Sequence, residues 1–334
     1  MQITDRYFLN VTTPTCHAST MVFYKDHPVF AWFGGIREGN PDSAIYVQYK
    51  DQVMCMGEHI PLAYWNPILF TIKDELFLAY KRGEFCDRWT TYILNITGIE
   101  QDTNILNKRV PQAIPAGLNF CTKTKPYIDS GGWIHCGSSV ETREDWTSYE
   151  EIYTYYDGKF IFDDRSKPLT VEKQKYSYRD RFYQERTGVT SGIIQPSIWV
   201  DNKNCYHAFF RSSRGLGKIY HSHKESSSWG DGEWTDPKPT DFDNPNSGID
   251  TVYTDNRLFL VHNPSKTNRC PLVVSELNDD FDIVDEIVVQ SEIDLSDHTL
   301  TKELSYPYMI EENKELHLVY TYGRTKIEYI KINI

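Results

Sequence analysis

Residues 193–215 read "IIQPSIWVDNKNCYHAFFRSSRG", two short apolar runs joined by the polar turn Asp201-Asn202. The first run opens at Gln195-Pro196, and the second ends at Arg211. β-branched and aromatic residues are common in both runs, which predicts two antiparallel strands of a β-hairpin. The question is whether this unit stands alone or repeats.

The pattern recurs along the chain, with copies that start near residues 17, 66, 125, 195, 250 and 306. A second pair of strand-like runs follows in most copies, as in "SAIYVQYKDQVMCM" (43–56). Four strands per repeat are typical of a propeller blade, and no helical periodicity of useful length interrupts them. We therefore expect an all-β fold, one six-bladed β-propeller over residues 1–334. The segment "ITDRYFLNVT" (3–12) should pair with the last blade and close the ring.

Propeller geometry places the start of each innermost strand at one mouth of the central channel. The next strand returns antiparallel, so Gln195 and Arg211, sixteen positions apart, should face the same mouth. Any one such pair has a plainer interpretation, namely polar residues that end strands at a wet surface. Pairs in phase throughout the repeat favour a concave site. The other pairs are Asn66 with Lys81, Lys125 with Glu141, Asp250 with His262, and Tyr306 with Tyr322.

Composition limits the classes of partner. Charged residues make up 25% of the chain and apolar ones 40%, as in an ordinary globular protein. The net charge is −12, which argues against nucleic acid or an anionic membrane as a partner. An anionic ligand would therefore need a local basic pocket.

Seven cysteines occur at irregular spacing and without a CxxC pair, which predicts reduced thiols and no zinc ribbon. The start "MQITDRYFLN" lacks the features of a signal peptide, and no apolar run is long enough to span a bilayer. These features predict a cytoplasmic protein or, alternatively, a virion component. No ligand spacing of a known type points to a metal or a cofactor.

Twelve short motifs, in order from Cys16 to Ile327, together resemble the sialidase-like BNR/Asp-box repeat family. They are "CHAST", "WFGGIREGNPD", "WNPILF", "YKRG", "KTKPY", "GSSVE", "IQPSI", "RSSRG", "NPNSGID", "PLVVS", "SYPYMI" and "TYGRTKI". The family's Asp-box survives in worn form, as "SSSWGDGEW" and "SELNDDFD". The resemblance implies a six-bladed propeller and exo-acting hydrolysis of acidic sugars such as sialic acid.

The resemblance also implies roles for individual residues. Sialidases grip the sugar carboxylate with three arginines, and they use a Tyr nucleophile, an assisting Glu and an Asp acid/base. Arginine suits this task because its planar fork donates bidentate, charge-assisted bonds. The resemblance assigns Arg37, Arg211 and Arg269 to the carboxylate, with Tyr306 as nucleophile.

Two positions depart from the family pattern. Gln195 stands where the resemblance places the assisting Glu, and Asn66 stands where it places an acid/base Asp. Both are amides, which cannot exchange protons. Arg37 lies in "GGIREG" rather than in the family's R-I-P motif, and together these departures argue against ordinary sialidase chemistry.

Asp42 and His17 are the candidates to handle the proton, with Glu38 as a further choice. Asp42 follows Arg37, and its alternative role is to pair with Arg37 or cap the turn in "GNPDS". His17 opens the first repeat, where an imidazole serves as acid, base or ligand, or as a hydrogen-bonded structural residue.

The remaining candidates would contact the substrate. Lys81 and Lys125 would add positive charge at the mouth, and Gln195, Asn66 and Glu141 would supply polar contacts. Asp250 is a base or hydroxyl-binding candidate, unless it only ties down the turn at 244–248. Trp32, Trp65 and Trp146 either stack on a sugar or pack between blades.

Three hypotheses follow for the function. The first is a sialidase-like exo-glycosidase that acts on an acidic glycan with altered acid/base residues. The second is a catalytically inactive glycan-binding or structural propeller, in one version virion-associated. The third is a polysaccharide lyase that uses Tyr306 and His17.

Overall fold

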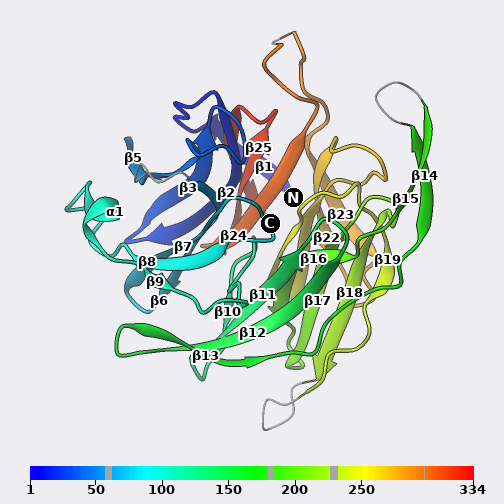
Figure 1. The fold of residues 1–334 in the computed structure, drawn as a ribbon, viewed down its shortest axis with the longest axis horizontal. Helices are drawn as coiled ribbons and strands as arrows, with labels where there is room; N and C mark the ends of the chain where they lie inside the picture. Colours follow the sequence, from blue (N-terminus) through cyan, green and yellow to red (C-terminus); the bar gives the residue numbers. More distant parts are fainter. Residues whose placement is uncertain (57–61, 180–183, 226–231, 297) are drawn as a thin grey trace.

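The computed structural model describes residues 1–56, 62–179, 184–225, 232–296 and 298–334. Their strands form six four-stranded antiparallel sheets that fan around a common centre (Figure 1). The first strands of neighbouring sheets contact one another, as β2 does with β6 and β24. The chain is therefore an all-β six-bladed propeller, as the repeat predicts.

Each blade runs from an innermost strand at the centre of the ring to an outermost strand at its rim. In that order, blades one to three are β2 (Thr15–Tyr24), β3 (His27–Gly35), β4 (Ala44–Tyr49) and β5 (Gln52–Met56); β6 (Ala63–Ile72), β7 (Glu75–Gly83), β8 (Thr90–Asn95) and β9 (Gln112–Ala113); and β10 (Tyr127–Ile128), β11 (Trp133–Glu141), β12 (Trp146–Tyr156) and β13 (Lys159–Arg165). Blades four to six are β16 (Ile193–Val200), β17 (Cys205–Ser212), β18 (Lys218–Glu225) and β19 (Lys238–Asp243); β20 (Asp250–Thr254), β21 (Arg257–His262), β22 (Leu272–Leu277) and β23 (Ile283–Gln290); and β24 (Leu304–Glu312), β25 (Glu315–Tyr322), β26 (Lys326–Asn333) and β1 (Gln2–Phe8).

Two elements lie outside the blades. β14 (Lys175–Arg179) and β15 (Glu185–Val189) form a hairpin that projects at the upper right of Figure 1. The short helix α1 (Ile105–Lys108) lies between β8 and β9. No helix in the described ranges is long and apolar enough to cross a membrane.

The ring closes where the two ends of the chain meet. β1 pairs antiparallel with β26, with Gln2 opposite Asn333 and Phe8 opposite Glu328. This confirms the predicted role of the N-terminal segment. Because the outermost strand of blade six comes from the start of the chain, backbone hydrogen bonds hold the two ends of the ring together.

Apolar side chains from adjacent blades pack together and form the core. Trp32 is fully buried, stacks on Tyr46 with 6.0 Å between ring centroids, and joins a cluster with Tyr308 and Val319 of blade six. Its role is packing between blades, the second of the two roles that the sequence left open.

Of the worn Asp-boxes, "SSSWGDGEW" (226–234) lies mostly outside the described residues. In the other, Asn278 Oδ1 accepts hydrogen bonds from Asp280 N and Asp282 N at 3.0 and 2.8 Å.

A β-bulge recurs in the innermost strands of four blades. The register shifts in β2, β6, β16 and β24, and the first bulged residue has a left-handed backbone: Ala18 (φ 51°), Asn66 (φ 38°), Gln195 (φ 55°) and Tyr306 (φ 51°). This conformation is unfavourable for a residue other than glycine and is often found at functional sites. A bulge redirects a side chain out of the regular alternation. The fold thus sets the direction of Asn66, Gln195 and Tyr306 with one repeated device.

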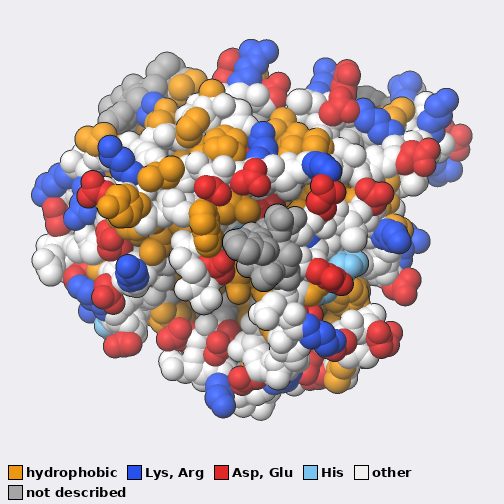
Figure 2. Space-filling view, turned by 90° about the horizontal axis from the view of Figure 1, so that it is seen from below, with side chains coloured by type: hydrophobic (Ala, Val, Ile, Leu, Met, Phe, Trp, Pro, Cys, Tyr) orange, Lys and Arg blue, Asp and Glu red, His pale blue; other side chains and the backbone are white. Residues whose placement is uncertain are grey.

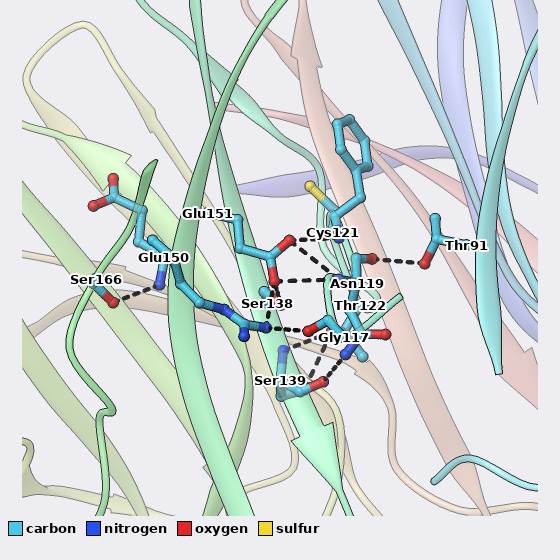
Figure 3. Close-up of polar contacts among 12 residues, drawn as sticks. Thr91, Gly117, Asn119, Cys121, Thr122, Ser138, Ser139, Glu150, Glu151 and Ser166 are labelled. Carbon is cyan, nitrogen blue, oxygen red and sulfur yellow. Dashed lines mark hydrogen bonds and ion pairs between the residues drawn. The ribbon is translucent and has the colours of Figure 1, made fainter. Parts of the chain in front are cut away.

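Glu151 of β12 fixes the loop that joins blades two and three (Figure 3). It is fully buried, and its carboxylate accepts hydrogen bonds from Phe120 N at 2.8 Å and from Ser138 Oγ and Arg165 Nη2 at 2.7 Å each. Asn119 N and Tyr153 Oη donate to the same carboxylate. The backbone N–H groups of residues 119 and 120 are therefore both fixed by hydrogen bonds to the one buried carboxylate of Glu151.

The ordered loop in turn holds two predicted site residues. Lys81 Nζ donates to the carbonyls of Asn119 and Cys121 at 2.5 Å each, and Asn66 Nδ2 donates to Thr122 O at 3.2 Å. Burial lowers the pKa of Lys81 to about 8. Lys81 is enclosed between blades rather than presented at the mouth, because backbone carbonyls take up its donors.

We expect Glu151→Gln to lower the free energy of unfolding by about 1–3 kcal/mol, since an amide cannot accept all the bonds that now converge on the carboxylate. Urea unfolding would measure the loss. Glu233→Gln is the matched control, because that side chain is 72% exposed. A loss for Glu151→Gln no larger than that of the control would contradict the assigned role.

Candidate functional site

Tyr306 lies at the centre of the candidate site, and Arg211 is its main partner. Arg211 Nη1 donates to Tyr306 Oη and to Gln195 Oε1, both at 3.0 Å. Arg211 Nε donates to Asn246 Oδ1 at 2.9 Å. We call Gln195, Arg211, Asn246 and Tyr306 the tyrosine cluster. Gln195 and Arg211, which the hairpin at 193–215 predicts to face one mouth, do meet in it.

A second group gathers around Glu303, just before β24. Its carboxylate pairs with Arg269 Nη1 at 2.5 Å and with Arg324 Nε at 2.9 Å. Arg324 Nη1 also pairs with Glu38. Burial alone raises the pKa of Glu303, but Arg269 and Arg324 outweigh it and hold that pKa well below its usual range.

The two groups form one continuous site. Arg269 Nη2 donates to the carbonyl of Asn246 at 2.7 Å, which ties it to the tyrosine cluster. His17 makes an edge-to-face contact with Tyr306, with 4.3 Å between ring centroids, and its Nε2 lies 3.8 Å from Glu303 Oε1. We call His17, Glu38, Arg269, Glu303 and Arg324 the glutamate cluster.

His17 is buried and uncharged at neutral pH. Burial lowers the pKa of His17 to about 3. Neither ring nitrogen has a hydrogen-bond partner among the described residues. A neutral imidazole with free nitrogens beside a phenol is placed to exchange a proton with it, but the lowered pKa of His17 makes it a weak base.

Glu141, at the end of β11, adds a carboxyl group on the other side of Gln195. Gln195 Nε2 donates to Glu141 Oε1 at 3.3 Å, and Ser139 Oγ donates to the same oxygen at 3.4 Å. Glu141 is half-buried. Burial raises the pKa of Glu141 against the opposing effect of Arg211.

The arginines of the site differ in whether an acidic side chain neutralises their charge. Glu303 pairs with Arg269 and Arg324, whereas Arg211 forms no ion pair in the part of the chain that the structure describes. Yet Arg211 is only 6% exposed. Its guanidinium carbon lies 5.7 Å from the ring centroid of half-buried Trp146, which shields one side of the charge. Figure 2 shows acidic and basic side chains interspersed over one face of the molecule.

Arg37 and Asp42 form no hydrogen bond or ion pair with the two clusters in the described chain. Arg37 is exposed in the turn after β3, and among the described residues its guanidinium forms no hydrogen bond or ion pair. Asp42 is also exposed, and its Oδ2 accepts a hydrogen bond from Ile36 N at 2.5 Å. Asp42 therefore caps the turn, one of the two roles that the sequence allowed. The guanidinium found beside Glu303 instead of Arg37 belongs to Arg324.

Lys125 and Asp250 lie deeper in the propeller. Lys125 Nζ pairs with Asp250 Oδ2 at 2.7 Å, and Asp250 is fully buried. Asp250 also accepts hydrogen bonds from Ser197 Oγ at 2.9 Å and Met309 N at 2.8 Å. One carboxylate thus joins blades four, five and six to Lys125, which precedes β10. It does not tie down the turn at 244–248, where Asn244 Oδ1 accepts from Asn246 N and Ser247 N.

Sequence reasoning missed Arg324, Glu303 and Asn246 as site residues. Arg324 had a usable signal, because it follows the second strand of its blade much as Arg211 ends the second strand of blade four. Glu303 and Asn246 precede innermost strands, where the repeat carries no side-chain periodicity.

No group of three or more His, Cys, Asp or Glu side chains among the described residues is arranged to hold a metal ion.

Comparisons with known proteins agree with this fold. A structure titled as a protein of unknown function from Dyadobacter fermentans has a TM-score of 0.72 at 15% identity, over 100% of this chain and 99% of that one. A Trypanosoma rangeli sialidase has a TM-score of 0.62 at 10% identity, and a Hadza microbial sialidase 0.56 at 8%; each match covers 96% of this chain. The chain spans 55% and 66% of the length of these two sialidases.

The comparison with curated proteins gives no match. The family model of the BNR repeat-like domain matches residues 27–318, most of the propeller. The chain belongs to the BNR repeat-like domain family, and its propeller has the sialidase fold.

Proposed function

We propose that the protein binds the terminal carboxylated sugar of an acidic glycan with Arg211, Arg269 and Arg324 and cleaves its glycosidic bond with Tyr306 as the nucleophile. The observation that carries the proposal is Arg211. It is a buried cation without an ion pair in the described chain, and its Nη1 lies 3.0 Å from Tyr306 Oη.

A buried charge is costly unless an opposite charge accompanies it. Arg211 Nη2 has no hydrogen-bond partner among the described residues, so it can still donate to a ligand. A sugar carboxylate would supply both the missing charge and the acceptor. Because the protein as a whole carries a charge of −12, this attraction comes from the site itself.

Arg269 and Arg324 would complete the grip. Glu303 fixes the orientation of both guanidinium groups, and their side chains remain 18% and 31% exposed. Arg269 Nε and Arg324 Nη2 have no partner in the described ranges, so each arginine keeps a donor for a ligand. The ion pairs with Glu303 hold these donors in place before the ligand arrives.

In the proposed reaction, Tyr306 Oη bonds to the anomeric carbon as the bond to the leaving oxygen breaks. Arg211 stabilises the negative charge that develops on Oη. The phenolic proton passes to a base, for which we propose neutral His17, and the leaving oxygen takes a proton from a general acid. Water then attacks the tyrosine-linked sugar and releases it.

Arg211→Ala should weaken the binding of free sialic acid and glucuronic acid by about 1.5–3 kcal/mol, the contribution of a charged hydrogen bond, and leave neutral galactose nearly unchanged. Titration calorimetry would measure all three sugars. Arg214→Ala is the control, because Arg214 is exposed three residues further along. Equal losses for charged and neutral sugars would rule out the carboxylate grip.

One contact favours elimination as a second candidate. Neutral His17 lies against Tyr306, so His17 would remove the proton next to a uronate carboxylate and Tyr306 would protonate the leaving oxygen. Product masses separate the two reactions, since hydrolysis adds one water and elimination does not.

The amides Asn66 and Gln195 favour a third candidate, a glycan-binding propeller that releases no product.

A further inference from the structure

We infer that Glu141 is the general acid that protonates the leaving oxygen. This inference rests on the proposed hydrolysis and names the proton donor that it needs. The two positions where the sialidase pattern places carboxylates hold the amides Asn66 and Gln195, so the donor must come from elsewhere in the site.

The other nearby carboxylates are poorly suited to give a proton. Glu303 and Glu38 both form ion pairs with Arg324, which keeps them ionised. Asp42 lies in an exposed turn and accepts a hydrogen bond from Ile36 N. Their partners leave Glu141 as the carboxyl group of the site without an ion pair among the described residues.

Gln195 connects Glu141 to the reaction centre. Its Nε2 donates to Glu141 Oε1 at 3.3 Å, while its Oε1 accepts from Arg211 Nη1 at 3.0 Å. The same Nη1 lies 3.0 Å from Tyr306 Oη. One amide side chain therefore separates the carboxyl group from the arginine that contacts the nucleophile. Gln195 is a positioning residue in this arrangement, and its left-handed backbone fixes the direction of the amide.

The surroundings of Glu141 favour its protonated form. The charged and titratable groups that face it are Arg211 of β17, Lys81 of β7 and Cys86 in the loop after β7. Burial raises the pKa of Glu141, and Arg211 and the Gln195 hydrogen bond oppose this only in part. A general acid needs a pKa closer to the working pH than that of an ordinary carboxylate.

The proton and the bonds balance over the two steps. In the first, the O–H bond of Glu141 breaks and its proton joins the leaving oxygen. The bond from this oxygen to the anomeric carbon breaks, Tyr306 Oη bonds to the carbon, and the phenolic proton passes to His17. In the second, the Glu141 carboxylate takes a proton from the water that attacks this carbon. The Tyr306–carbon bond breaks, the phenolic oxygen regains its proton from the imidazolium of His17, and Glu141 returns to its protonated form.

Glu141→Gln tests the inference with two substrates that differ in their leaving group. Sialyllactose needs a proton on its leaving oxygen, whereas 4-methylumbelliferyl sialoside carries an activated aglycone that departs without one. We expect kcat/KM for sialyllactose to fall by about 10²–10⁴-fold and kcat/KM for the activated sialoside to fall by less than about tenfold, because kcat/KM reports the first step and not the later attack of water, which Glu141 assists for both substrates. The alkaline limb of the kcat/KM profile should also vanish, because it reports the deprotonation of Glu141.

The control is Glu144→Gln, an exposed glutamate three residues away, which should leave both rates unchanged. If wild-type protein turns over sialosides through Tyr306 and Glu141→Gln lowers kcat/KM equally for both substrates or keeps the alkaline limb, the Glu141 assignment is wrong and the proposed function stands. If wild-type protein releases sugar from neither sialosides nor the matching pair of glucuronides, the proposed function fails and the inference with it.

Discussion

Tyr306→Phe should reduce turnover by at least roughly 10³-fold, the scale seen when a nucleophile is removed. The affinity for an acidic sugar should change by no more than about 1 kcal/mol, because one neutral hydroxyl contact is lost. Arg211 keeps its bonds to Gln195 and Asn246 in the variant, so the grip on the carboxylate stays in place. Steady-state kinetics with the activated sialoside and calorimetry with the free sugar would measure the two quantities.

Tyr322→Phe is the matched control for this change. The repeat paired Tyr322 with Tyr306, but the Tyr322 ring packs against Phe8, with 5.4 Å between ring centroids. Its hydroxyl should therefore be dispensable for turnover. Full activity in Tyr306→Phe would exclude Tyr306 as the nucleophile, whatever the control shows.

Asp250→Ala should lower the free energy of unfolding by about 3–5 kcal/mol, because it leaves the Lys125 ammonium without its buried partner. It also removes the acceptor of Ser197 Oγ and Met309 N, which join neighbouring blades. Urea unfolding would measure the loss. Asp279→Ala is the control, since that carboxylate is 75% exposed and pairs with exposed Lys203.

A double variant separates the attraction between Lys125 and Asp250 from the free-energy cost of burying their charges. Lys125→Met combined with Asp250→Leu replaces both charges with apolar groups, and it should recover part of the stability that Asp250→Ala loses. A loss for Asp250→Ala of no more than about 1 kcal/mol would mean that the buried pair does not hold the blades together.

The repeat predicts the fold because blade strands follow a local rule. Apolar runs, turns and their phase are all visible in residues 193–215, and the same phase locates the ends of β16 and β17. The closure of the ring by β1 follows from the same logic, since an unpaired strand at the start matches a three-stranded unit at the end.

The site is harder to predict from the sequence than the fold, because its contacts join residues of different blades. Phase correctly places Gln195 and Arg211 together. Lys81, however, donates to carbonyls of the loop after its own blade, and Lys125 pairs with Asp250 of another repeat. Arg37 stays a prediction. It is exposed in the turn that Asp42 caps, and a strand period says nothing about side-chain direction after the strand ends.

The decisive experiment is mass spectrometry of the products from a panel of sialylated and uronic-acid glycans, with Tyr306→Phe in parallel. We predict that wild-type protein releases a terminal acidic sugar with one water added, and that the variant releases none. Saturable binding of one of these glycans without any product, from wild-type protein as from the variant, would contradict the proposed hydrolysis and identify the propeller as a glycan-binding module.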